Sequence, residues 1–342
     1  MTEQEIQILE SMLDRIEKCE ETNRLLLDSN KALLRSNQVL SESLENLRRE
    51  YEHFTENVTY ESNDPVRSGE LFYPRIKTID ETIAILLSGK KSLCRFGDGE
   101  FACISGNLRA SFTTSFNRKL AERLKEVLES SDNDIMIAIA DNYGDLSEYL
   151  FASRREIRSY MTETIRKEHY SLLDPDRDYY NAYITRPYMF LQGEPVSTKE
   201  YWDKIRTLWD NKDVVIIEGA NTGMGVGNDL LENCKSIKRI VAPAIDAFDK
   251  YEEIIKETVK QPQESLYLAA LGPAATVLAY DLAKSGRRAI DIGHLDIEYE
   301  WMKRGEYRVT IPGKYVNEVV GGTSPEAIHD SDYEKQIIAR IG

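Results

Sequence analysis

The stretch Leu93-Cys94-Arg95-Phe96-Gly97-Asp98-Gly99-Glu100-Phe101 joins a short apolar run to two carboxylates that alternate with glycines. The run from Ser92 to Phe96 predicts a buried β-strand. In an extended backbone, Asp98 and Glu100 would project to the same side, because they lie two residues apart. Paired carboxylates at the open end of a strand suit Mg²⁺ or Mn²⁺, which prefer oxygen ligands and can bridge to phosphates. A solvated acidic turn after a strand is the alternative interpretation.

Composition limits the class of protein. The chain has 342 residues and a formal net charge of −15, which argues against a nucleic-acid partner. We find neither the pattern of a signal peptide nor an apolar run near the roughly 20 residues of a membrane span. The four cysteines (Cys19, Cys94, Cys103 and Cys234) lack CxxC spacing, which favours reduced thiols over zinc or disulfides. We therefore expect a cytoplasmic protein.

Residues 6–54 carry a heptad repeat. The a positions are Leu9, Ile16, Asn23, Asn30, Asn37, Leu44 and Tyr51, and the d positions are Met12, Cys19, Leu26, Leu33, Leu40, Leu47 and Phe54. Seven heptads without proline or glycine predict a coiled coil that makes the chain a homo-oligomer. Asparagine at three a positions costs stability but fixes register and oligomer number. Apolar Leu13, Leu27 and Leu34 at e positions leave open a trimer, or a helix packed on its own body.

The rest of the chain predicts an α/β domain. We assign residues 1–55 to the coiled coil, 56–70 to a polar linker and 71–342 to the domain. Further strands are expected at 134–140, 214–218, 240–243, 266–271 and 289–292, with helices between them. This alternation predicts a mostly parallel, Rossmann-like sheet, whose ligands bind at the carboxyl ends of the strands. Because polar loops follow these strands, we expect the loops to form one site.

A glycine-rich turn, residues 219–228, follows one of these strands. It contains Gly223, Gly225 and Gly227 and precedes a helix expected over 229–234. Such a turn can present backbone N–H groups and a helix N-terminus to a phosphate. The turn matches neither GxGxxG nor a P-loop with its lysine. A tight turn that requires positive φ is therefore the alternative.

The segment from His294 to Glu300 is rich in carboxylates. As an extended chain, its His294, Asp296, Glu298 and Glu300 would share one face. As a helix capped by Asp296, it would place Asp296 and Glu300 together at i, i+4. Either conformation can supply a general base or a metal ligand. A structural histidine and a solvated helix start are the alternatives.

Four motifs together resemble the bacterial glycosyltransferases of the GT-D fold family, long described as a domain of unknown function. They are Arg95-Phe96-Gly97-Asp98-Gly99-Glu100, Thr185-Arg186-Pro187-Tyr188, Gly225-Val226-Gly227-Asn228-Asp229-Leu230 and Gly293-His294-Leu295-Asp296-Ile297-Glu298-Tyr299-Glu300-Trp301. The resemblance covers about residues 70–320 and leaves the coiled coil outside. It implies a Rossmann-like sheet that binds a nucleotide sugar, usually UDP-linked, and a divalent metal held by a DxE motif. That motif is here Asp98-Gly99-Glu100. One departure is Asn221-Thr222-Gly223-Met224, where a basic residue would be expected.

The resemblance implies a role for each motif. We expect sugar transfer from a nucleotide sugar, UDP-glucose first, to a hydroxyl of a glycan or glycoprotein in bacterial surface glycosylation. Asp98, Glu100 and His294 are the candidate ligands of Mn²⁺ or Mg²⁺, and Asp296 or Glu300 is the candidate base. The candidate nucleotide-sugar residues are Arg95, Gly97, Asn142, Arg186, Gly223, Gly225, Gly227, Asn228 and Gly272. The location is expected to be cytoplasmic, with association at the membrane surface left open.

Two other functions remain as alternatives. A nucleotide-dependent oxidoreductase would use the same glycine-rich turn, with Asp246 on the ribose, but it leaves Asp98-Gly99-Glu100 unexplained. A coiled-coil scaffold with a degenerate sugar-nucleotide domain would have no use for carboxylates in two separate loops.

Overall fold

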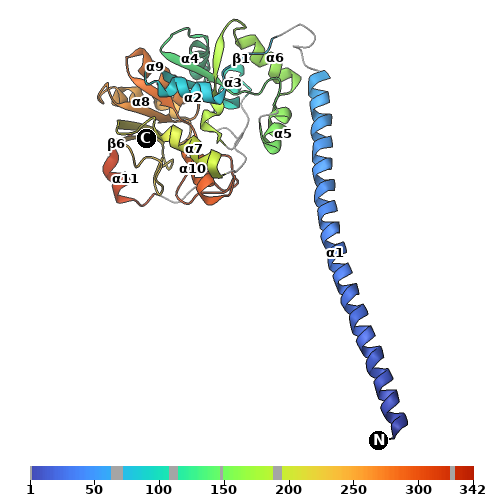
Figure 1. Cartoon of the computed structure of the whole chain (residues 1–342). Helices are drawn as coiled ribbons and strands as arrows, with labels where there is room; N and C mark the ends of the chain where they lie inside the picture. The colour runs from blue at the N-terminus through green and yellow to red at the C-terminus, as the bar shows by residue number, and fades with distance from the viewer. Residues whose placement is uncertain (1, 63–71, 108–114, 147–148, 188–194, 324–327) are drawn as a thin grey trace. The chain divides into compact units, whose positions relative to one another are not determined.

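A computed structural model describes residues 2–62, 72–107, 115–146, 149–187, 195–323 and 328–342 (Figure 1). The chain divides into two units, Met1–Ser62 and Asn63–Gly342. Residues 56–62, which the sequence pattern assigns to a linker, are helical. The remainder of that linker, 63–70, lies outside the described residues.

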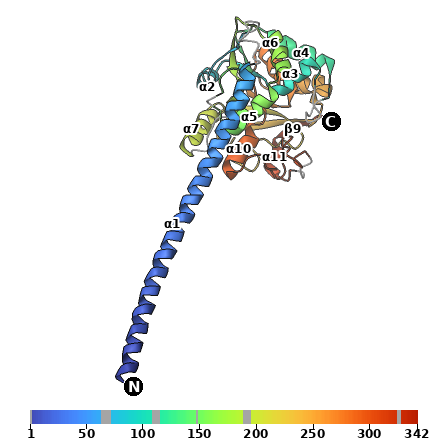
Figure 2. The same ribbon diagram turned by 90° about the vertical axis from the view of Figure 1, so that its right-hand side faces the viewer.

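The first unit is one helix, α1 (Glu3–Ser62). At 1.5 Å per residue, its 60 residues extend over about 90 Å. Figure 2 shows the helix from the side. The large apolar side chains at the a and d positions are exposed, from 48 % for Leu9 to 67 % for Leu44. The helix therefore presents an uncovered apolar stripe along its length.

The second unit is built on a nine-stranded sheet in the order β1-β4-β3-β2-β8-β7-β5-β6-β9. Its strands are β1 (Arg75–Ile76), β2 (Ser92–Phe96), β3 (Ile135–Ile139), β4 (Asp178–Asn181), β5 (Asp213–Gly219), β6 (Ser236–Ala242), β7 (Leu266–Ala270), β8 (Arg288–Asp291) and β9 (Ile337–Arg340). Every described strand pairing is parallel. The expected fold class is thus confirmed, and β1, β4 and β9 extend the sheet beyond the strands that the sequence predicts.

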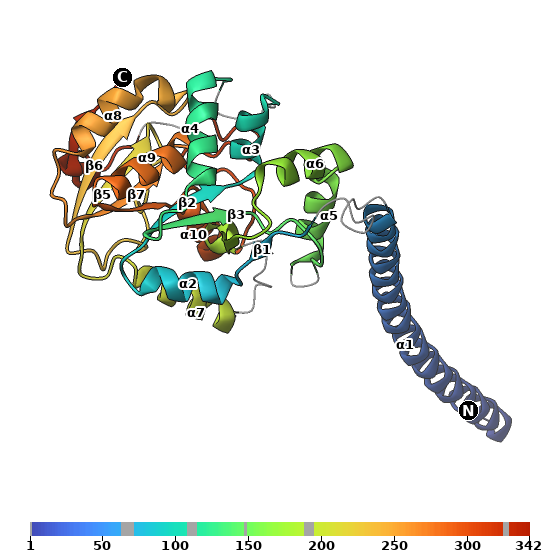
Figure 3. The same ribbon diagram turned by 90° about the horizontal axis from the view of Figure 1, so that it is seen from above.

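Helices cover both faces of the sheet. They are α2 (Ile79–Leu87), α3 (Asp98–Ser105), α4 (Arg118–Glu129), α5 (Phe151–Tyr160), α6 (Glu163–Leu172), α7 (Pro195–Arg206), α8 (Tyr251–Thr258), α9 (Pro273–Lys284), α10 (Leu295–Arg304) and α11 (Ser331–Gln336), with 3₁₀ turns η1 (Ala182–Thr185) and η3 (Ala247–Lys250). Figure 3 shows α4, α8 and α9 on one side of the sheet and α2 and α7 on the other. The helix expected over 229–234 is instead a series of turns, so the glycine-rich loop does not lead into a helix N-terminus.

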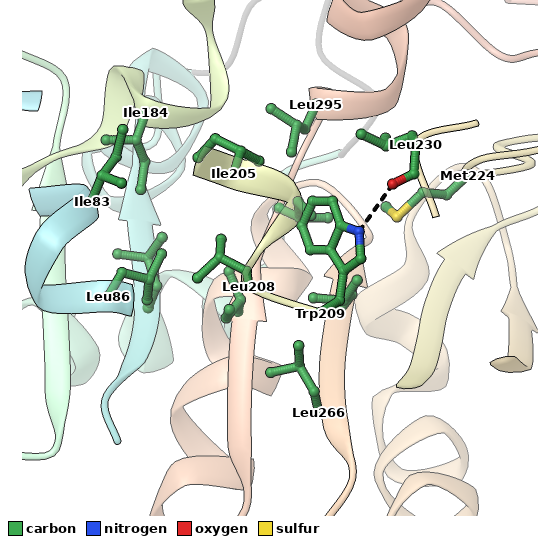
Figure 4. Close-up of a cluster of buried hydrophobic side chains, with 14 of the residues drawn as sticks. Ile83, Leu86, Ile184, Ile205, Leu208, Trp209, Met224, Leu230, Leu266 and Leu295 are labelled. Atoms are coloured by element: carbon green, nitrogen blue, oxygen red, sulfur yellow. Dashed lines mark hydrogen bonds between the residues drawn. The ribbon is translucent and has the colours of Figure 1, made fainter. Parts of the chain in front are cut away.

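The buried core under α2, α7 and α10 is centred on Trp209 (Figure 4). Alternate residues of β5, Val214 and Ile216, point into this core, as the two-residue period of a strand requires. Trp209 is fully buried, and its indole N–H donates a 2.9 Å hydrogen bond to the Leu230 carbonyl. This bond ties the turns after the glycine-rich loop to the core.

Within the described residues, no helix has both the length and the apolar composition needed to cross a lipid bilayer.

Candidate functional site

A cavity of about 680 Å³ lies at the carboxyl edge of the sheet. It is lined by residues that follow seven strands: Gly97 after β2, Asn142 after β3, Tyr183 after β4, Thr222 after β5, Ala244 after β6, Gly272 after β7 and His294 after β8. The polar loops that the sequence places at strand ends therefore meet around one cavity. Its volume is typical of small-molecule sites.

Asp98 and Glu100 open helix α3 and do not continue β2 as an extended chain. Gly97 is the N-cap, and its N–H donates a 2.7 Å hydrogen bond to Glu100 Oε2. Because successive helical residues rotate by about 100°, residues two apart diverge, so the expected same-side projection is wrong. Both side chains nevertheless line the cavity. A glycine followed three residues later by glutamate is a helix-start signal that could have corrected this prediction.

The pKa of Glu100 departs from that of an ordinary carboxyl group. Burial and the neighbouring charge of Asp291 raise the pKa of Glu100 to about 7. The Gly97 N–H and the Arg95 guanidinium favour the charged form and offset only part of this effect. The carboxyl group thus titrates near neutral pH, where a nearby cation would favour its ionised form.

The predicted metal ligands can be tested against these contacts. The described ranges contain no group of three or more His, Cys, Asp or Glu side chains arranged to hold a metal ion. A protein-only cage of Asp98, Glu100 and His294 is therefore not formed. Mg²⁺, however, is often bound by one or two carboxylates completed by substrate phosphates. Asp98 and Glu100, at the cavity wall, fit that second arrangement.

Arg95 is held in the cavity wall by Asp291. Its Nε donates to the Asp291 carbonyl at 2.8 Å and its Nη2 donates to Asp291 Oδ1 at 2.7 Å. The hydroxyl of Thr276 donates to Asp291 Oδ2 at 3.2 Å. Gly293 allows this arrangement, because a Cβ there would lie 2.0 Å from Arg95 Nη2. The guanidinium is thus fixed with 15 % of its side chain exposed.

Arg186, Glu318 and His294 form a second charged cluster in the wall. Arg186 pairs with Glu318, and His294 Nδ1 lies 3.0 Å from Glu318 Oε1. Burial alone would raise the pKa of Glu318, but Arg186 and His294 outweigh burial and hold it well below its usual range. Glu318 therefore stays ionised and positions both basic groups. Tyr188, the last residue of the Arg186 motif, lies outside the described residues.

A buried ion pair holds the glycine-rich loop in place. Arg239 Nη1 donates to Glu218 Oε1 at 2.7 Å, and both side chains are almost completely buried. Glu218 also accepts from the Met224 N–H at 2.8 Å, while Arg239 donates to the Met224 carbonyl at 2.8 Å. The loop is therefore preformed, with Gly219 and Thr222 facing the cavity.

The later glycines of the loop allow its backbone to turn tightly. Gly223, Gly225 and Gly227 have φ of 55°, 74° and 77°, which supports the tight-turn interpretation. These three glycines and Asn228 lie outside the set of residues that lines the cavity. Because these residues do not line the cavity, the structure does not support their expected role in binding the nucleotide.

Asp296 and Glu300 do share one face of α10, but neither is among the residues that line the cavity. They are 2 % and 7 % exposed, and Lys314 Nζ donates to them at 2.6 and 3.3 Å. Asn228 Nδ2 donates to both at 2.9 and 2.7 Å. The helix cap is His294 and not Asp296. A general-base role for either carboxylate remains a prediction that this geometry disfavours.

Gly272 and Asn142 are placed as expected of binding residues. Gly272 has φ of 55° and precedes Pro273 at the first position of α9, whose N-terminus adjoins the cavity. Unpaired N–H groups and the helix dipole favour an anion there. Asn142 accepts a hydrogen bond from the Tyr183 hydroxyl. The cavity also includes Tyr315 and Arg308, from a polar segment without periodicity that the sequence does not single out.

A parallel α/β sheet with a cavity outside the carboxyl ends of its strands is the ligand-binding arrangement of open α/β domains. A family model described as the glycosyltransferase GT-D fold matches residues 93–319, and the chain belongs to this family.

Relatives and solved structures support this assignment. The chain is 32 % identical over 269 residues to the glycosyltransferase GlyD of Streptococcus pneumoniae. The matched region covers 78 % of this chain and 32 % of that protein. It is 33 % identical over 268 residues to the probable glycosyl transferase Gly of Streptococcus gordonii, covering 78 % of this chain and 39 % of the relative. The chain therefore spans 32 % to 39 % of the length of these curated relatives.

A solved structure described as a new glycosyltransferase (DUF1792) from Streptococcus sanguinis has a TM-score of 0.72 at 32 % identity. The similarity covers 79 % of this chain and all of that one. A second, reported as a highly conserved domain of unknown function with a distinct glycosyltransferase fold, has a TM-score of 0.71 at 34 % identity. It covers 79 % of this chain and 96 % of that one.

Proposed function

We propose that this chain transfers a sugar from a UDP-linked donor, with UDP-glucose as the first candidate, to a hydroxyl of a glycan or glycoprotein. The observation that carries the proposal is the cavity, whose lining includes both the N-terminus of α9 and the acidic start of α3. Membership of the GT-D family and the names of the two relatives support the reaction class.

The diphosphate of the donor is assigned to the N-terminus of α9 and to two arginines of the cavity. The Gly272 end of α9 offers backbone donors, and Arg95 and Arg186 line the same cavity. Each arginine already contacts a carboxylate, Asp291 or Glu318, which fixes its orientation before the donor arrives. Because a guanidinium carries five N–H donors, it can contact phosphate without leaving that carboxylate.

Asp98 and Glu100 would hold a divalent cation, Mn²⁺ or Mg²⁺, together with phosphate oxygens, and His294 is a further candidate ligand. Such a cation would neutralise the charge of the departing diphosphate. The protein contributes a fixed helix start, in which the Gly97 N–H orients Glu100.

The base that deprotonates the acceptor is a separate question. Asp296 or Glu300 could reach an acceptor only if the segment around Lys314 moved, since that lysine and Asn228 occupy both carboxylates. In the described conformation neither carboxylate is free to accept a proton from an acceptor hydroxyl in the cavity.

The oxidoreductase alternative receives no support from the geometry. Asp246, its candidate ribose ligand, accepts a 2.6 Å hydrogen bond from the Ser115 N–H and is not among the residues that line the cavity.

Calorimetric titration with UDP-glucose and with NAD, each with and without Mn²⁺, tests the proposal. We expect UDP-glucose to bind in a Mn²⁺-dependent way, and Asp98→Asn or Glu100→Gln to abolish that dependence and the transfer reaction. Glu129→Gln, on the exposed end of α4, is the control and should leave both unchanged. Binding of NAD alone would favour the oxidoreductase, and no nucleotide binding at all would favour the scaffold.

A further inference from the structure

The apolar stripe of α1 lies outside the matched family region and plays no part in the proposed reaction. Four successive d positions are leucine, and Leu26, Leu33, Leu40 and Leu47 are 57, 58, 57 and 63 % exposed. Helices draw most of their stability from packing an apolar face, so a 60-residue helix with this stripe uncovered lacks its main stabilising contact. The spacing of seven residues matches a left-handed supercoil with another helix.

We propose that α1 pairs with α1 of a second copy of this chain as a parallel, in-register, two-stranded coiled coil. The sequence repeat indicates an oligomer. Orientation, register and strand number follow from which residues would face each other in each arrangement.

The asparagines decide the orientation. In a parallel, in-register pair, a residues face a residues, so Asn23, Asn30 and Asn37 each meet their own copy and the side-chain amides can hydrogen-bond. In an antiparallel pair, a residues face d residues, all of which are apolar here. Each buried amide would then lack a hydrogen-bond partner, which destabilises that arrangement. Three successive asparagine layers therefore select the parallel pair.

The flanking positions agree with this orientation. In a parallel pair, a g residue faces the e residue five positions further along the other chain. Arg15 at g then meets Glu20 at e, an opposite-charge contact, and Ile8 meets Leu13, an apolar one. Leucine at d accompanies two strands when a is β-branched, as at Ile16, and asparagine at a specifies the oligomer state.

Cys19 provides a direct test, because it is a d residue exposed on α1. In the proposed pair, the two Cys19 side chains face each other across the axis. An antiparallel pair places Cys19 opposite an a residue far along the other chain. Mild oxidation of the full chain should therefore yield a disulfide-linked dimer, and Cys19→Ser should remove it. The Cys19→Ser result also measures any contribution of Cys94, Cys103 and Cys234.

Two further variants keep the test decisive if Cys19 reacts poorly. Leu40→Cys in the Cys19→Ser background introduces another d-layer cysteine and should also cross-link. Glu21→Cys in the same background points outward at an f position and should not. Sedimentation equilibrium of the unoxidised full chain should give twice the mass of the chain. A monomer or a trimer overturns the proposal, and so does a dimer in which neither d-layer cysteine cross-links.

Discussion

Replacing Lys314 by methionine should destabilise the second unit more than any comparable change at a surface lysine. Lys314 is 4 % exposed, and its ammonium group contacts both Asp296 and Glu300. Methionine preserves most of the volume but removes the positive charge. Two nearly buried carboxylates would then keep weaker compensation: the Asn228 amide contacts both, the Gly225 N–H donates to Asp296, and Arg304 lies 3.5 Å from Glu300.

The magnitude follows from the loss of one partner in a buried ion pair, which costs about 3–5 kcal/mol. Because the Asn228 donors remain, we expect the lower end, about 3 kcal/mol. This is a large share of the roughly 5–15 kcal/mol that stabilises a typical domain. The melting temperature should fall by roughly 5–10 °C. Donor affinity should fall too, since Tyr315, next in the chain, lines the cavity.

Denaturant unfolding of matched variants measures the effect. Lys303→Met is the control, because Lys303 is 46 % exposed in its ion pair with Asp229, where about 0–1 kcal/mol is expected. Combining Lys314→Met with Asp296→Asn and Glu300→Gln should recover much of the loss, since no buried charge is left unpaired. Equal unfolding free energies for Lys314→Met and Lys303→Met would refute the reasoning.

Two other predictions concern the cavity wall and its support. Gly293→Ala should lower both donor affinity and the free energy of unfolding, because its Cβ would collide with Arg95. Gly313 has φ of 73° and open space around it, so Gly313→Ala should lower only the free energy of unfolding, by the roughly 1–2 kcal/mol of left-handed backbone strain. Equal effects of the two alanines on UDP-glucose binding, measured by calorimetry, would contradict the proposed role of Gly293. Burial lowers the pKa of His169 from an ordinary 6.5 to about 3. Between these two values the unfolded chain binds a proton that the folded protein does not, so the free energy of unfolding is full above pH 6.5 and decreases as the pH falls toward 3. His169→Gln should therefore flatten the fall of unfolding free energy between pH 6.5 and 4, by up to about 1.4 kcal/mol per pH unit, and parallel profiles would rule this out.

The strands of the sheet interior are the part of this structure that the sequence predicts best. Ser92–Phe96 forms as expected, because a continuous apolar run between turn residues has few other ways to be buried. The edge strands β1 and β9 escape prediction because they have two and four residues and half-exposed patterns. Short edge strands carry little periodic signal.

The site is less predictable, since its contacts join distant segments. Periodicity places Asp296 and Glu300 on one helix face, but cannot reveal that Lys314, in a segment without a pattern, neutralises both. Spacing also cannot tell whether the chain after Phe96 stays extended or turns into a helix at Asp98. These outcomes depend on tertiary contacts that override local preference.

The pairing of β2 with β8 has a consequence for biosynthesis. The Ala289 N–H donates to Ser92 Oγ across 197 residues, and Leu93 pairs with Ile290 at the middle of the sheet. At about 5–20 residues per second, a ribosome needs roughly 10–40 s to make the chain between these partners. During that interval β2 has one unpaired, apolar edge, which is a hazard for aggregation. Nascent chains that end before residue 288 should therefore depend on chaperones, and full-length chains should refold slowly, as proteins with such distant contacts do.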